Sequence, residues 1–99
     1  MENIMNEEIR RLVEEWEEDV AVHSSTTIIL AHPNHAKLVA MGMEAVPHII
    51  TLMRERSHLV LSFVLHEITG EQPIPPEDAG RVRRINEHWL KLAEEKGWG

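Results

Sequence analysis

Apolar positions recur along the chain at the spacing of α-helices, and they are densest in residues 43–69. Between Leu59 and Ile68 nearly every residue is apolar, which predicts a helix buried on most of its sides. Before it, apolar residues at helical spacing predict a one-sided helix; they are Ala45, Val46, Ile49, Ile50, Leu52 and Met53. The two helices would form a central hairpin, with Ser57 as the N-cap of the buried helix.

A second amphipathic pattern predicts an N-terminal helix over residues 5–23, with Asn6 near its start as a cap. Its apolar face comprises Met5, Ile9, Leu12, Val13, Trp16 and Val20. Its opposite face is acidic and comprises Glu7, Glu14, Glu15, Glu17 and Glu18. We interpret this face as solvated, and the alternative is an acidic patch for a basic partner.

Turn-forming residues divide the rest of the chain. Residues 24–27 are hydroxyl-bearing and end the first helix. Residues 28–30 form either one helical turn, which we favour, or a small apolar plug over the core. His32, at the cap, and Pro33, at the first helical position, begin a short helix that stops at Gly42, and Gly70 ends the buried helix. A proline-rich connection over 70–76 leads to a C-terminal helix over 77–96. The predicted architecture is one all-α domain over 1–99, with four main helices and one or two short ones.

The central hairpin resembles a HEAT-type helical pair. The resemblance lies in residues 41–53, MGMEAVPHIITLM, followed by an apolar helix that ends in ITG. In that family a small residue and a proline open the first of two antiparallel helices. The matching positions are Gly42, Ala45, Val46, Pro47, Ile50, Met53, Leu61, Leu65 and Ile68. The wider pattern from Ser24 to Leu90 resembles that of small, uncharacterised bacterial proteins and implies no activity, whereas HEAT-like units imply protein binding.

Composition narrows the classes of function. The formal net charge is −7 and the chain has no cysteine, which excludes disulfides and thiol chemistry. Nucleic-acid binding is disfavoured by this charge, although a contact through Arg81, Arg83 and Arg84 stays open. We recognise neither a signal peptide at the acidic N-terminus nor an apolar run of membrane-spanning length, so we expect a cytoplasmic protein without a membrane partner.

The seven histidines are the one compositional oddity. Asp19 and His23 lie four residues apart and His32 and His35 three apart, so these four could converge on a metal such as zinc. No complete metal motif is present, because Gly70 stands where an HExxH pattern beginning at His66 needs its second histidine. We therefore expect no cofactor, and a metal-binding protein or metal-dependent hydrolase is the alternative.

A stripe of polar residues interrupts the most apolar helix. His58, Ser62 and His66 are spaced i, i+4, i+8, which is typical of a helix that surfaces or of a subunit interface. Together with Glu14 and Glu18 they are the candidate partner-binding residues. The sequence thus favours a non-catalytic protein-interaction module that binds a protein partner or its own copy, such as an accessory, inhibitor or antitoxin-like subunit.

Overall fold

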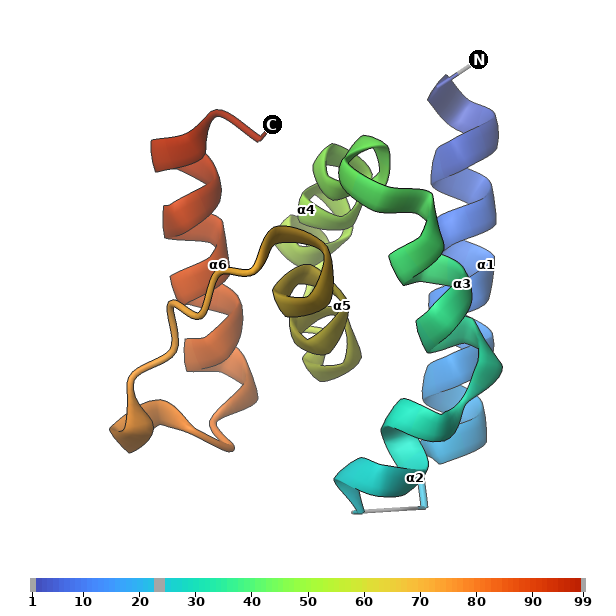
Figure 1. Cartoon of the computed structure of the whole chain (residues 1–99), viewed down its shortest axis with the longest axis horizontal. Helices are drawn as coiled ribbons and strands as arrows, with labels where there is room; N and C mark the ends of the chain where they lie inside the picture. Colours follow the sequence, from blue (N-terminus) through green and yellow to red (C-terminus); the bar gives the residue numbers. More distant parts are fainter. Residues whose placement is uncertain (1, 23–24, 99) are drawn as a thin grey trace.

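The helices lie in three groups across the molecule (Figure 1). The computed structural model describes residues 2–22 and 25–98. Helices α1 (Glu2–Val20) and α3 (Pro33–Met41) pack together at one end, and α6 (Val82–Lys96) lies at the other. Between them lie α4 (Val46–Glu55) and α5 (Leu59–Thr69). The short elements are α2 (Thr26–Ala31) and two 3-10 turns, η1 (Gly42–Ala45) and η2 (Pro76–Asp78). The described residues contain no strand, which confirms the all-α class.

The core is mainly aliphatic, with one tryptophan toward each end. Trp16 on α1 and Trp89 on α6 are both fully buried, and α4 and α5 fill the space between them. Fully buried side chains on these two central helices include Ile49, Ile50, Leu61 and Leu65. The apolar stripes predicted from helical spacing are therefore the surfaces that meet in the core.

Several helix ends differ from their predicted positions. Helix α1 begins at Glu2 and ends at Val20, so Asn6 is inside the helix, where its side chain contacts His48. The N-cap of α5 is His58 rather than Ser57. Helix α6 begins at Val82 rather than at residue 77, because η2 and a turn at Gly80 come first. Caps that depend on tertiary contacts are not visible in local sequence patterns.

Other local predictions are confirmed. Residues 28–30 are helical, as favoured, although their helix α2 begins at Thr26, within the stretch predicted to be a turn. The His32 side chain caps α3 by accepting a hydrogen bond from the Asn34 backbone N–H, with Pro33 at the first helical position. Gly70 ends α5 in the left-handed conformation, at φ 74°.

One stretch, Pro33–Glu55, is long and apolar enough by length and composition to cross a membrane, which the sequence reasoning did not anticipate. It is not one straight helix, because α3 ends at Gly42, whose φ is 69°, and the chain turns there into α4 (Figure 1). Each of the two helices is shorter than the roughly 20 residues that a membrane span needs. The most apolar side chains of α4 lie in the core instead.

Candidate functional site

A groove runs between α5 and the proline-rich connection that follows it. Its volume is about 380 Å³. The lining comes from α2, α5, the connection and the start of α6, and comprises Thr26, Leu59, Ser62, Phe63, His66, Gln72, Ile74, Pro75, Pro76, Ala79, Gly80 and Ile85. None of these residues is Asp, Glu, Lys or Arg, although such residues make up 27% of the chain. A neutral, mainly apolar hollow on a strongly charged protein is the best candidate site in the part of the chain that the structure describes.

The three residues of the predicted polar stripe on α5 have three different environments. His58 is buried, with 5% of its surface exposed; its backbone N–H bonds to Asn86 and its ring bonds to Glu17. Ser62 lines the groove, and its Oγ accepts a hydrogen bond from Trp89 Nε1 at 2.8 Å. His66 is exposed on the groove wall, with its Nδ1 2.9 Å from the carbonyl oxygen of Glu71. The stripe is therefore not one surface, and only Ser62 and His66 border the groove.

His58 belongs to an ionic network between α1 and the α4–α5 link. Glu17 accepts hydrogen bonds from His58 Nδ1 at 2.9 Å and from Arg56 Nη2 at 2.6 Å. Burial raises the pKa of the Glu17 carboxyl, but these two hydrogen bonds outweigh it, so that the net pKa lies below its ordinary value. The carboxylate is thus held in its charged form, and this network joins helices rather than offering a reactive acid.

Asn86, which is also buried, bonds to backbone groups at the facing ends of α4 and α5. Its Nδ2 donates to the carbonyl oxygen of Met53 at 2.6 Å, and its Oδ1 accepts from the backbone N–H of His58 at 3.3 Å. The first group lies in the last turn of α4 and the second at the start of α5, where helices leave backbone groups without intrahelical partners. One side chain of α6 therefore fixes how α4 and α5 meet.

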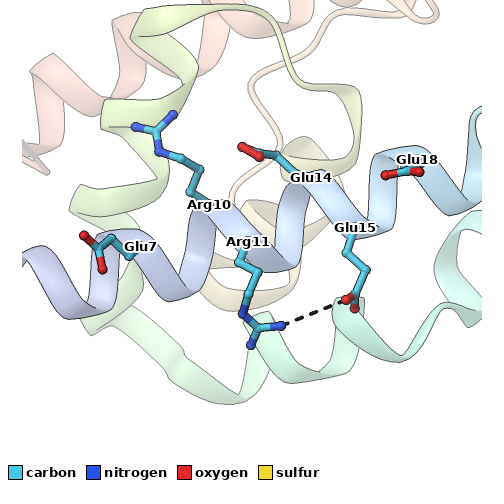
Figure 2. Close-up of a pocket in the computed structure, with 6 residues that line it drawn as sticks. All are labelled: Glu7, Arg10, Arg11, Glu14, Glu15 and Glu18. Atoms are coloured by element: carbon cyan, nitrogen blue, oxygen red, sulfur yellow. Dashed lines mark ion pairs between the residues drawn. The ribbon is translucent and has the colours of Figure 1, made fainter.

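The other predicted partner-binding residues, Glu14 and Glu18, lie on the exposed face of α1. Figure 2 shows them with Glu7, Arg10, Arg11 and Glu15 around an open depression. The volume of this depression is about 410 Å³. Arg10 forms a two-point ion pair with Glu55 at 2.8 and 2.9 Å, and Arg11 lies 3.1 Å from Glu8. This charged face is a row of exposed Glu and Arg side chains along one helix, and its lining contains no apolar residue, so it is a weaker candidate than the groove.

The predicted metal ligands are only partly brought together. Asp19 Oδ2 lies 2.7 Å from His32 Nε2, whereas His35 is 5.6 Å from Trp16 between ring centroids and contacts its edge. His23 lies outside the described residues. Over residues 2–22 and 25–98, no group of three or more His, Asp or Glu side chains is arranged to hold a metal ion.

The hydrogen bonds of His32 also determine its tautomer. Its Nδ1 accepts the backbone N–H of Asn34, so in the neutral ring the proton is on Nε2 and points at Asp19. A metal ion at Nε2 would need that proton to move to Nδ1, which would break the cap of α3. His32 is therefore arranged as the cap of α3, with its ring held in place by the Asp19 carboxylate.

The arginines proposed for a nucleic-acid contact lie around the start of α6 beside acidic side chains. Arg84 Nε is 3.6 Å from Asp78 Oδ2, and Arg83 Nε is 4.0 Å from Glu87 Oε2. Asp78 also accepts a hydrogen bond from His88 Nε2 at 2.7 Å. This hydrogen bond and the nearby charge of Arg84 both lower the pKa of the Asp78 carboxyl. Carboxylates thus partly neutralise the cations that would meet a phosphate backbone.

No family model, curated protein or solved structure matches this chain in the comparisons with known proteins. The function must therefore be inferred from the site itself. Sequence reasoning missed Phe63, Ile74 and Ile85 as groove residues, because they belong to three separate segments. The sequence signal for this wall of the groove was the run of prolines after α5. Such a run cannot form a helix and predicts a segment that runs extended over the surface.

Proposed function

We propose that this protein is a non-catalytic protein-interaction module whose docking site is the groove between α5 and residues 72–80. The observation that carries the proposal is the neutral, mainly apolar lining of that groove on a chain with a net charge of −7. Burying apolar surface is favourable by roughly 25 cal/mol per Å². An apolar partner segment would gain from that burial without having to neutralise a charge.

The groove walls are held in place before a partner arrives. Trp89 binds Ser62 on one side, and His66 contacts the carbonyl of Glu71, where the connection begins. A docking site that is already ordered loses less conformational entropy on binding than a flexible one. The polar atoms of His66 and Gln72 line the same groove and could orient a backbone segment of the partner.

The partner chemistry that fits is a short segment with neutral apolar side chains, such as one face of a helix. Selection from a library of displayed peptides should therefore enrich uncharged apolar sequences. Binding of a selected peptide should shift the backbone NMR signals of Phe63, Ile74 and Ile85. Substitution of Phe63→Lys should weaken binding by more than about tenfold, because a charge would be buried in an apolar site.

Met43→Lys is the matched control for that experiment. Met43 is an exposed apolar residue on η1 and does not line the groove. Its substitution should leave peptide affinity unchanged. Shifts confined to the acidic face of α1, or equal losses in both variants, would refute the groove as the docking site.

The cellular location, the role and the HEAT-like character that we propose for the protein rest on its amino-acid composition and on sequence resemblance. The module would act in the cytoplasm as an accessory, inhibitor or antitoxin-like subunit, consistent with its lack of cysteine. Its central helix pair would be a single HEAT-like hairpin, a fold analogy that also favours protein binding.

A further inference from the structure

Helix α6 holds both walls of the groove through two adjacent residues. Trp89 Nε1 donates a hydrogen bond at 2.8 Å to Ser62 Oγ on the α5 wall. His88 Nε2 lies 2.7 Å from Oδ2 of Asp78, which belongs to the segment that forms the second wall, residues 72–80. The imidazole donates this second hydrogen bond, because a carboxylate only accepts. Successive residues of a helix are about 100° apart, so one turn of α6 reaches both walls.

The Asp78 side chain faces α6 rather than the groove. Residues 74–76 and 79–80 line the groove on either side of it, whereas Asp78 itself is 5% exposed and does not. Besides His88, its carboxylate lies 3.6 Å from Arg84 Nε on the same helix. A buried carboxylate is unfavourable unless it is paired and hydrogen-bonded, so these contacts with α6 stabilise Asp78 in this position.

The backbone of the second wall is built around Asp78. Its N–H donates to the carbonyl oxygen of Pro75 at 3.0 Å, and its own carbonyl oxygen accepts the N–H of Arg81 at 3.0 Å. At the other end of the wall, Glu71 Oε2 lies 3.3 Å from Lys96 Nζ in an exposed ion pair, and such pairs contribute little to stability. Asp78 therefore provides the buried polar attachment of this wall to α6.

We propose that Asp78 and His88 position the second wall and thereby set the affinity of the groove for an apolar partner segment. This inference rests on the function proposed above. Both act through the wall, because neither lines the groove. Without their contact, residues 72–80 are free to move away from α5, and only the molecules whose wall is in place are ready to bind. The apparent affinity then falls in proportion to that fraction.

Substitutions of His88 test this inference. The probe is an uncharged apolar peptide selected on the unaltered chain, and isothermal titration calorimetry measures its affinity. His88→Ala removes the donor and should weaken binding about fivefold or more. His88→Gln offers a side-chain N–H in place of that of the imidazole, so its affinity should stay within about twofold of that of the unaltered chain.

Hydrogen exchange follows the wall itself, without a peptide. The backbone N–H groups of Ala79 and Arg81 are hydrogen-bonded within the wall, to the carbonyl oxygens of Pro76 and Asp78. Their exchange should accelerate in His88→Ala and remain slow in His88→Gln, because opening of the wall breaks these hydrogen bonds.

Two controls separate movement of the wall from a general loss of stability. Glu87→Gln removes an exposed carboxylate 3.6 Å from Arg84 on the same helix and should leave affinity and exchange unchanged. Ile9→Val trims a fully buried side chain of α1 and should lower the free energy of unfolding without changing peptide affinity. Asp78→Ala removes the contact from its other side and replaces His88→Ala if that variant loses helical circular dichroism.

Two results would overturn the inference. The first is unchanged exchange of the wall in His88→Ala, which would show that the contact does not hold it. The second is faster exchange with unchanged or tighter peptide binding, which would show that the wall does not set the affinity. In both cases the peptide still binds the groove and the proposed function stands. Failure of every selected peptide to bind the groove of the unaltered chain would refute the proposed function, and this inference with it.

Discussion

Trp89 Nε1 of α6 donates a hydrogen bond to Ser62 Oγ of α5 at 2.8 Å, so a fully buried ring holds a residue of the groove wall. The next residue, Phe63, also lines the groove. The contact joins the core to the candidate site, since the position of the α5 wall depends on the packing of α6 against it.

A double-mutant cycle should measure this contact. Ser62→Ala, Trp89→Phe and the double variant remove the hydroxyl, the indole N–H or both. We expect a coupling energy of about 0.5–1.5 kcal/mol from urea unfolding, because net hydrogen-bond contributions fall in that range. A cycle of Trp89→Phe with Thr51→Ala is the control, since the Thr51 hydroxyl donates to the Pro47 carbonyl within its own helix and should show no coupling.

Asn86→Ala should be one of the most destabilising polar substitutions. It would leave the Met53 carbonyl and the His58 backbone N–H buried without their partner. We expect a loss of about 2–4 kcal/mol in the free energy of unfolding, since each unsatisfied buried group costs about 1–3 kcal/mol. Glu94→Ala, at an exposed position on the same helix, should change stability by less than about 0.5 kcal/mol. A small effect of Asn86→Ala would show that water replaces both hydrogen bonds.

The free energy of unfolding should fall in acid, partly because the Glu17 carboxylate becomes protonated. Burial raises the pKa of this carboxyl, but hydrogen bonds from His58 and Arg56 bring the net pKa below the ordinary 4.5. The unfolded chain therefore takes up the proton first as pH falls. The contribution of Glu17 is complete above about pH 4.5 and is lost as pH falls through the lower pKa of the folded protein.

Glu17→Gln tests that expectation. The unaltered chain should be more stable than this variant at neutral pH, and the difference should shrink steadily in urea titrations below about pH 4.5. Glu18→Gln, at the exposed neighbouring position, should follow the unaltered chain at every pH. A difference between the unaltered chain and Glu17→Gln that stays constant with pH would contradict a role for the charged Glu17.

Trp16→Phe should loosen α2 more than the rest of the protein. It removes the indole N–H that binds the Ile29 carbonyl while keeping an aromatic ring in the core. Amide hydrogen exchange of residues 26–31 should accelerate, because local opening of α2 then breaks fewer contacts. Exchange in α5 should rise only by the global loss of stability, and equal acceleration in both helices would contradict a specific anchoring role.

Local sequence signals were sufficient to predict the helical class and several helix ends. Apolar residues at helical spacing predict the buried faces of α1 and α4, because 3.6 residues per turn puts those positions on one side. Gly70 and His32 act as predicted, since a left-handed glycine and a side-chain cap depend only on nearby backbone.

The tertiary structure alone decided which polar residues belong to the candidate site. His58, Ser62 and His66 share a spacing in the sequence, yet Glu17 from α1 binds the first, which is buried, and Trp89 from α6 binds the second. The groove, likewise, exists only because residues 72–80 lie against α5. Such contacts join residues far apart along the chain, and helical periodicity describes only one helix at a time. The sequence thus determined the elements of this protein, and packing between them determined its surface.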